Sequence, residues 1–376
     1  MTGAARSAAS GRDRRRFAST PSCTVACVVL AVACSSDGGG DSQDAGRDAA
    51  DAASDGDAST PERGATDAAM PQDAAATQQG DADTQVGAFT IELVAAVEGS
   101  AGGAETPAFV SVVGRVHDGE TPQQVLWVPL MEGSGCTVLE PTVPFCDPTC
   151  GSGQACAGED DCRDYPTAVN VGTVTLTGLA AEDGAQELTM EPLPPSNTYQ
   201  PRTDVTLRYP PFIPGDPVRL QAEGGSGAAF DIDTVGIAPL ILTTTGPVRF
   251  AEDEAVHVEW EAGEEPTARI RVVVDISHHG GQRGEIDCHV ADTGSMEIPA
   301  ELVTQLLELG WSGFPTLRIS RETVGSTVIA AGRVDLVVSS AEVLPIDIPG
   351  LTSCNDVGAA EGCPDGQTCQ ADLQCQ

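Results

Sequence analysis

The chain has 376 residues and a mass of 38.5 kDa, and it carries 19 basic residues against 56 acidic ones, for a formal net charge of −37. All 19 basic residues are arginine. A chain without lysine has no P-loop lysine and no Schiff-base lysine, which excludes P-loop nucleotide hydrolysis and pyridoxal-phosphate chemistry. Because like charges repel, we expect no nucleic-acid partner and no attraction to anionic lipid headgroups.

Residues 1–33 have the layout of a secretory signal peptide. Arg12 and the run Arg14–Arg16 form a basic start, and an apolar run follows from Cys23 to Ala33. A membrane-spanning helix needs about 20 apolar residues to cross the hydrocarbon core, so this run is too short to remain in the bilayer. The segment is therefore expected to direct export and to be removed afterwards.

The signal segment ends in Leu30-Ala31-Val32-Ala33-Cys34-Ser35. These residues resemble the lipobox of bacterial lipoproteins, in which small residues precede a cysteine that receives lipid, although Ala31 stands where leucine is usual. The resemblance implies lipidation of Cys34. Ala31-Val32-Ala33 is also an acceptable site for ordinary signal peptidase. Both alternatives start the mature chain at Cys34, and they differ in whether the protein is anchored or free.

Residues 34–86 are expected to form a disordered acidic linker behind Cys34. Positions 35–86 contain 12 acidic and two basic residues, many of them in Asp/Ala repeats, and no aromatic residue. Such a composition buries too little apolar surface to offset the entropy of ordering the chain, and repulsion among the aspartates extends it. The linker therefore indicates a flexible stalk between a lipidated cysteine and a folded body.

Residues 87–242 are predicted to form a β-rich domain with a cysteine-rich insertion at 136–165. Short runs of β-branched residues alternate with clusters of Gly, Pro, Asp and Ser, which is typical of an all-β sandwich or barrel. The proline-rich stretches 192–195 and 210–214 are expected in loops or at sheet edges. The expected strands are 89–97, 109–116, 124–130, 169–177, 205–209, 217–222 and 228–235.

Residues 243–348 are predicted to form a second β-sandwich with one short helix. Apolar residues alternate with polar ones around Trp260, which is the period of a strand with one buried face. Pro299 suits the first turn of a helix that Gly310 ends. The expected strands are those near 247–250, at 256–260, 270–276 and 286–290, and at about 315–323 and 327–339. This pattern resembles a fibronectin type III or immunoglobulin-like sandwich, with Trp260 where such folds keep an early-strand tryptophan.

The chain also resembles envelope lipoproteins of the myxobacterial type. The resemblance lies in the Asp/Ala stalk, in Pro144-Phe145-Cys146-Asp147-Pro148-Thr149-Cys150, and in Asp292-Thr293-Gly294-Ser295-Met296-Glu297-Ile298-Pro299-Ala300. It implies a β-structured protein tethered to the outer membrane, facing the periplasm or the cell surface. It implies no particular chemical activity.

Cysteines form two clusters, the second of them in a small C-terminal module at 349–376. The segments Cys150–Cys162 and Cys363–Cys375 both read Cys-x5-Cys-x5-Cys and indicate an internal repeat. In an exported chain such density predicts disulfides rather than zinc, with the connectivity left open. Cys288 stands apart, either as a small core residue or as a partner of Cys136. The disulfide candidates are Cys136, Cys146, Cys150, Cys156, Cys162, Cys354, Cys363, Cys369 and Cys375.

Two short motifs invite a catalytic interpretation. Asp292-Thr293-Gly294 matches the signature of aspartic proteases, whose chemistry needs two carboxylates that share a proton, so a homodimer would have to supply the second copy. The alternative is a simple turn. His278-His279 precedes two glycines and is expected in a hairpin loop, with its two rings pointing opposite ways on an extended backbone.

These observations together predict an exported, lipid-anchored protein of the cell envelope, all-β in fold, with a binding or structural role and no catalysis. We expect no cofactor, no metal and no catalytic residue. The expected partners are the membrane, through the lipid on Cys34, and an envelope protein or a glycan. The alternatives left open are a secreted hydrolase of the aspartic-protease type and a carbohydrate-binding sandwich, for which Trp127 and Trp311 are the aromatic candidates.

Overall fold

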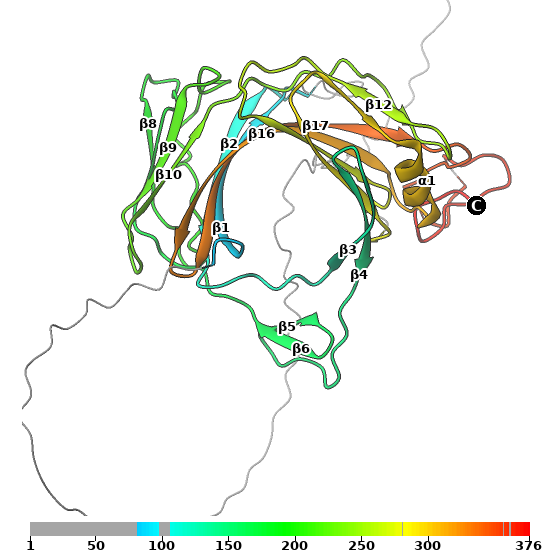
Figure 1. Ribbon diagram of the computed structural model, residues 1–376, viewed down its shortest axis with the longest axis horizontal. Coiled ribbons are helices and arrows are strands. Elements are labelled where there is room, and N and C mark those ends of the chain that lie inside the picture. The colour runs from blue at the N-terminus through cyan, green and yellow to red at the C-terminus, as the bar shows by residue number, and fades with distance from the viewer. Residues whose placement is uncertain (1–80, 98–105, 280, 356, 361) are drawn as a thin grey trace, which may run out of the picture. The chain divides into compact units, whose positions relative to one another are not determined.

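The computed structural model describes residues 81–376 apart from 98–105, 280, 356 and 361 (Figure 1). The described residues form 17 strands and one helix, and all of them belong to one contact unit that spans residues 72–376. The all-β class expected from the sequence is therefore confirmed. The predicted signal peptide at 1–33, Cys34, and all but the last six residues of the predicted linker lie outside the described residues.

A nine-stranded sheet forms the centre of the structure. Eight of its strands follow the order β2-β1-β17-β16-β13-β14-β4-β3, and β11 lies beside β17. In chain order the nine strands are β1 (Gln85–Val94), β2 (Phe109–Val116), β3 (Leu126–Gly133), β4 (Cys136–Thr142), β11 (Val248–Arg249), β13 (Arg269–Asp275), β14 (Glu285–Ala291), β16 (Thr316–Ile329) and β17 (Gly332–Asp347).

Three smaller sheets accompany the central one. A four-stranded sheet has the order β10-β9-β7-β8, and two further sheets each contain one antiparallel pair, β12 with β15 and β5 with β6. Their strands are β5 (Gln154–Gly158), β6 (Asp161–Asp164), β7 (Val174–Thr177), β8 (Glu187–Met190), β9 (Pro217–Ala222), β10 (Phe230–Val235), β12 (Val256–Glu259) and β15 (Ser295–Ile298).

The strands from β11 to β17 pair as an immunoglobulin-like sandwich does. In that fold the second and fifth strands are neighbours in one sheet, and the third, sixth and seventh are neighbours in the other. Here β12 pairs with β15, while β16 lies between β13 and β17. Trp260 directly follows β12 and is buried in the core of this sandwich. These are pairings of an immunoglobulin-like sandwich, except that β14 pairs with β13 and β4 in the central sheet instead of lying in the sheet of β12 and β15.

One helix, α1 (Ala300–Glu308), connects β15 to β16. Pro299 precedes it and Gly310 follows it at φ +80°, as the sequence predicted. Its side chains at every third or fourth position are apolar, and they pack against the second core described below. The buried residues of the helix are Leu302, Val303, Leu306 and Leu307.

Two apolar cores hold the fold together, and the long β16–β17 hairpin contributes to both. The first core lies between the β10-β9-β7-β8 sheet and strands β1, β2 and the first half of β17, which supplies Val334, Leu336 and Val338. The second core lies in the immunoglobulin-like sandwich and takes Leu317 and Ile319 from the start of β16. Because this hairpin supplies buried side chains to both cores, packing of each core requires the hairpin to be in place.

The predicted ranges 87–242 and 243–348 do not coincide with separate sheets. Strand β1 pairs in parallel with β17, from Gln85 opposite Arg333 to Leu93 opposite Ser340, and β4 pairs with β14. Strands from both ranges therefore share the central sheet. Alternating hydrophobicity shows which face of a strand is buried, but it does not show which distant strand is its neighbour, so a boundary placed by composition missed these pairings.

Most expected strands of the first half exist, with shifted ends. The exception is 205–209, which contributes only an isolated bridge between Leu207 and Ala181. The proline-rich stretches 192–195 and 210–214 lie outside regular strands, as predicted. Strands β4, β5, β6, β8 and β15 were not predicted. The first three lie in the segment interpreted as a cysteine-rich insertion, and β8 and β15 have only four residues each, too few for alternation to be recognised.

Candidate functional site

The two cysteine clusters form small modules that share one disulfide connectivity. We call Val143–Tyr165 the first module and Leu351–Gln376 the second module. In each, the first cysteine bonds to the third and the second bonds to the fourth. The repeat seen in the sequence is thus also a repeat of crosslinks. The four bonds are Cys146–Cys156, Cys150–Cys162, Cys354–Cys369 and Cys363–Cys375.

Cys136 and Cys288 form a fifth disulfide, across β4 and β14, where they stand directly opposite each other with their Cα atoms 3.9 Å apart. Both side chains are buried in the second core. All nine disulfide candidates are thus bonded, and the alternative left open for Cys288 resolves to a pair with Cys136. Cys136 belongs to the central sheet rather than to the insertion in which the sequence placed it, because its strand pairs with β14.

In each module three cysteine sulfurs lie within 4.8 Å of one another, which is also the arrangement that a metal ion would need. The sulfurs concerned belong to Cys146, Cys150 and Cys156 in the first module, and to Cys354, Cys363 and Cys375 in the second. All of them are bonded in disulfides, and a disulfide sulfur has no thiolate to offer a metal. The closeness is what two interlaced disulfides produce in a short loop.

Asp292 lies in the turn from β14 to β15, as the turn interpretation predicted, and Gly294 at φ +93° completes that turn. The carboxylate itself is buried. Its Oδ1 accepts a hydrogen bond from Trp260 Nε1 at 2.7 Å, and its Oδ2 accepts bonds from the Gly263 amide at 3.1 Å and from Arg321 Nε at 2.6 Å. The side chains of Asp292 and Arg321 are 3% and 2% exposed, so they form a buried ion pair.

Arg321 completes this network from β16. Its Nη1 donates to the carbonyl oxygens of Ala238 and Pro239, and its Nη2 donates to the carbonyl oxygen of Glu261 and to Asp292 Oδ1. Every N–H of the guanidinium therefore has an acceptor. The network joins four segments: β16, the chain after β10, the chain after β12, and the β14–β15 turn. A buried charge pair survives in a protein only with this degree of hydrogen bonding.

This environment decides between the two interpretations of Asp292-Thr293-Gly294. An aspartic protease needs a second carboxylate close enough to share a proton. Asp292 has a guanidinium as its partner, and three structural donors occupy its two oxygens. Space is also closed: a Cβ on Gly263 would lie 2.5 Å from Asp292 Oδ2 and 3.1 Å from Arg321 Nε. Asp292 holds the sandwich together, and the protease alternative loses its catalytic group.

No role for Arg321 was predicted from the sequence, although one signal was present. Arg321 stands at the same alternation parity as Leu317 and Ile319, so its side chain faces the core. An arginine in a core-facing strand position requires a buried acceptor. Searching for that acceptor among the carboxylates of strand ends would have led to Asp292.

The His278-His279 pair lies in the turn after β13, as expected, but the prediction that its rings point apart is wrong. The ring centroids are 4.0 Å apart, and His278 Nδ1 lies 3.5 Å from Asp275 Oδ2. His279 has a φ of +63°, in the left-handed region, so the backbone is not extended there and the alternation argument fails.

A group of charged side chains occupies the face of the central sheet opposite the second core. Arg271 donates two hydrogen bonds of 2.9 Å to the carboxylate of Asp287 on the neighbouring strand. Glu285 lies two residues before Asp287 and directly across from Asp275. Burial, together with the charges of Asp287 and Asp275, raises the pKa of Glu285 to about 7, and Arg271 opposes the shift. A half-buried carboxyl of this face therefore titrates near neutrality.

Replacing Glu285 with glutamine is expected to stabilise the protein above pH 7 and to leave its stability at pH 4 unchanged. A carboxyl whose pKa is about 7 when folded and about 4.5 when unfolded binds more proton in the folded state, so the free energy of unfolding falls between pH 4.5 and 7. After allowance for solvent screening, the gain in Glu285→Gln at pH 8 is about 1–2 kcal/mol.

Urea titrations of both proteins at pH 4, 6 and 8 measure this difference. Glu187→Gln, which removes an exposed carboxyl from β8, is the matched control for the loss of one negative charge. If the free energy of unfolding falls equally in Glu285→Gln and in the parent protein from pH 4.5 to pH 7, the raised pKa of Glu285 is not the cause of the fall.

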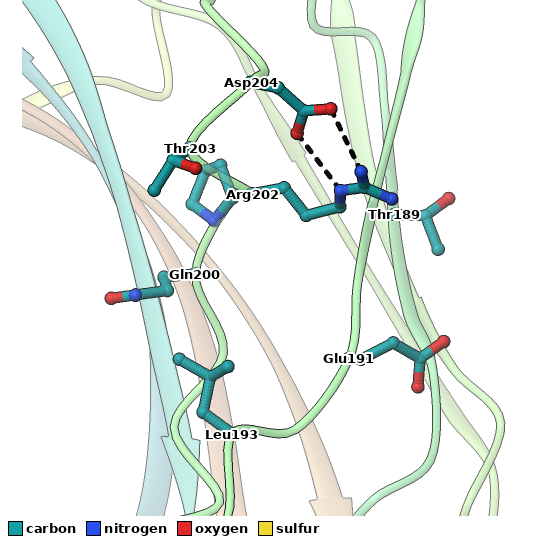
Figure 2. Close-up of a pocket in the computed structure, with 8 residues that line it drawn as sticks. Thr189, Glu191, Leu193, Gln200, Arg202, Thr203 and Asp204 are labelled. Atoms are coloured by element: carbon teal, nitrogen blue, oxygen red, sulfur yellow. Dashed lines mark hydrogen bonds and ion pairs between the residues drawn. The ribbon is translucent and has the colours of Figure 1, made fainter.

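An open groove of about 580 Å³ lies where the chain leaves β8 (Figure 2). Arg202 and Asp204 form an exposed two-bond ion pair on one side of it, with distances of 3.1 and 3.0 Å, and Glu191 lies on the other side. The eight lining residues include no histidine or cysteine. They are Thr189, Glu191, Leu193, Gln200, Pro201, Arg202, Thr203 and Asp204.

The aromatic candidates for a glycan site do not form a platform. Trp311 is 39% exposed and lies in the loop before β16. Trp127 is less exposed than Trp311 and lies in β3, at the edge of the central sheet. A sugar-binding face uses exposed rings side by side, and neither tryptophan makes a ring contact within the described part of the chain. The described residues therefore give the glycan alternative no specific support.

No helix among the described residues is long and apolar enough to cross a membrane. The chain matches no protein-family model and no curated protein. Among solved structures it is similar to the FN1–FN3 domains of chicken CNTN1, at 8% identity over 64% of this chain and 72% of that chain, with a TM-score of 0.15. Because a likeness this weak carries no argument, the assignment of an immunoglobulin-like sandwich rests on the strand pairings.

Proposed function

We propose that this chain is an exported cell-envelope protein, anchored in the outer membrane by lipid on Cys34, and that its β-structured body has a binding or structural role without catalysis of its own. The observation that carries the proposal is the set of five disulfides, which includes all ten cysteines of the described part of the chain. Disulfides persist in oxidising compartments, whereas the cytosol keeps thiols reduced.

The anchor is supported by the sequence before Cys34 and by the acidic segment after it. The small residues Ala31 and Ala33 precede Cys34, and the acidic, aromatic-free linker would hold the body away from the bilayer. One acyl chain binds a membrane only weakly, and stable anchoring takes a second one. A bacterial lipoprotein cysteine carries more than one chain, which suits permanent attachment.

A role in binding or structure is supported by how the polar groups of the body are used. The one carboxylate that matched a catalytic motif, Asp292, is occupied by Arg321, Trp260 and Gly263. The groove beside β8 is open, and two of its charged side chains, Arg202 and Asp204, pair with each other. Asp292 is therefore arranged to hold structure rather than to activate a nucleophile.

Replacing Cys34 with alanine is expected to move the protein from the membrane fraction to the soluble fraction of a Gram-negative host that exports it. The parent protein should partition into detergent and incorporate labelled palmitate, and Cys34→Ala should do neither. Cys27→Ala is the matched control, since Cys27 lies inside the removed signal segment.

Two results would overturn parts of this proposal. Membrane fractionation of Cys34→Ala equal to that of the parent would remove the lipid anchor. A parent protein found soluble, with an unmodified Cys34 at its N-terminus, would show cleavage by ordinary signal peptidase and would leave export without anchoring.

A further inference from the structure

The two modules share backbone geometry as well as disulfide connectivity. Gly153 and Gly366, which hold equivalent positions, have φ of +85° and +87°. Asp160 and Leu373, two residues before the last cysteine of each module, have φ of +56° and +61° although neither is glycine. Left-handed conformations at matching non-glycine positions are uncommon, so the two modules can be compared position by position.

The second module uses one of its faces to dock onto the immunoglobulin-like sandwich. Ser353 Oγ and Gln374 Nε2 both donate to the carbonyl oxygen of Gly313, at 2.8 and 2.6 Å, and the Gly313 amide donates to the backbone carbonyl oxygen of Asp372 at 2.7 Å. Gln374 is buried in this contact. Ser353 precedes the first cysteine of the module, and Gln374 precedes the last.

The equivalent face of the first module is uncovered. Phe145 precedes its first cysteine and is 74% exposed, and Asp161 precedes its last cysteine and has a side chain that is 45% exposed. Val143 is 71% exposed and lies two residues before Phe145, in the irregular segment that follows β4. No other large apolar side chains of the described residues are as exposed as these two.

Charge identifies the kind of surface that would fit this face. The first module contains five acidic residues and a single basic one, Arg163, which is already paired with Asp161 at 2.9 Å. A second copy of this chain, at a net charge of −37, would be repelled. A complementary surface therefore carries arginine or lysine together with apolar side chains.

We propose that the first module is a docking site for a basic protein surface that also carries apolar side chains, with Phe145 as the side chain that packs against those apolar groups and the exposed Val143 two residues before it. An exposed aromatic side chain held by crosslinked backbone loses little entropy on binding, which is the property of an interface anchor. The second module performs the corresponding docking within the chain. This proposal rests on the binding role proposed above but does not depend on the lipid anchor.

Binding of synthetic peptides to the full-length disulfide-bonded protein tests the proposal. The probes are an Arg/Leu peptide, a Glu/Leu peptide with the same leucines, and a polyarginine of equal charge, each followed by fluorescence anisotropy. We expect the Arg/Leu peptide to bind most tightly. Phe145→Ser should weaken its binding by about 30-fold, the effect of losing an interface anchor worth 2 kcal/mol.

Ile213→Ser is the matched control, because Ile213 is almost as exposed but lies in a loop before β9. It should bind as the parent does. Intact mass should show all five disulfides in both variants, which excludes misfolding as the cause. Equal binding by Phe145→Ser and the parent would overturn the proposal, since it would leave only a general attraction to the acidic chain. So would equal binding of the Glu/Leu and Arg/Leu peptides.

The outcomes separate this proposal from the proposed function. If Cys34→Ala shows that no lipid anchor exists, peptide binding through Phe145 is still expected. If Phe145→Ser binds like the parent while Cys34→Ala leaves the membrane, the envelope proposal stands and the docking site is wrong.

Discussion

Replacing Arg321 with methionine is expected to lower the free energy of unfolding by about 3–5 kcal/mol, the cost of leaving one partner of a buried ion pair unpaired. The variant leaves the Asp292 carboxylate without its counter-ion, and it leaves the carbonyl oxygens of Ala238, Pro239 and Glu261 without their donor. Urea denaturation followed by tryptophan fluorescence measures the loss, because the network includes Trp260 itself.

The matched control is Arg202→Met, which breaks an exposed arginine–aspartate pair with the same two-bond geometry. Exposed pairs contribute about 0–1 kcal/mol, so the control should hardly move the transition. Should Arg321→Met fail to fold, Arg321→Lys keeps the charge but loses the planar fork, and it should show an intermediate loss. Equal losses in Arg321→Met and Arg202→Met would contradict a structural role for the Asp292–Arg321 pair.

Removal of the Cys136–Cys288 disulfide, by changing both cysteines to alanine, is expected to lower the free energy of unfolding by about 4–5 kcal/mol. The two cysteines are 152 residues apart, so the bond restricts the unfolded chain far more than a local crosslink does. It also joins β4 to β14 inside the second core, where both side chains are buried. Denaturation monitored by fluorescence in urea gives the loss.

The comparison is with Cys150→Ala/Cys162→Ala, which opens a loop of only 12 residues in the first module. The expected change is about 3 kcal/mol at most, and it should be confined to the module, because the bond lies outside both apolar cores. Limited proteolysis should therefore cut this variant between residues 143 and 165 while the main unfolding transition stays in place. If the urea midpoint of the main transition falls equally in both double variants, the Cys136–Cys288 bond does not stabilise the body more than the Cys150–Cys162 bond does.

The sequence predicted individual strands better than it predicted which strands are neighbours in a sheet. Alternation around Trp260 and over 270–276 and 286–290 placed β12, β13 and β14, because one face of each strand is buried and the pattern follows the burial. The parallel pairing of β1 with β17 joins residues almost 250 positions apart. No local periodicity encodes such a pairing, so the division at 242/243 separated strands that share a sheet.

The candidate site shows the same limit. The Asp292-Thr293-Gly294 motif was interpreted as either a turn or an aspartic-protease signature, because the same three residues occur in both. The partner of the carboxylate decides between them, and Arg321 lies 29 residues further along the chain. The cysteine repeat was easier, because matching spacings in two segments of one chain point to matching crosslinks, and the structure has them.

The pairing of β1 with β17 also fixes the order in which the chain can be completed. Strand β1 can pair only after β17 has been synthesised, because Gln85 lies opposite Arg333. Both cores also include residues from the β16–β17 hairpin. Non-local contacts of this kind make folding slow. A growing polypeptide would thus stay unclosed until nearly its whole length had been released, which is the state that a translocation channel can thread.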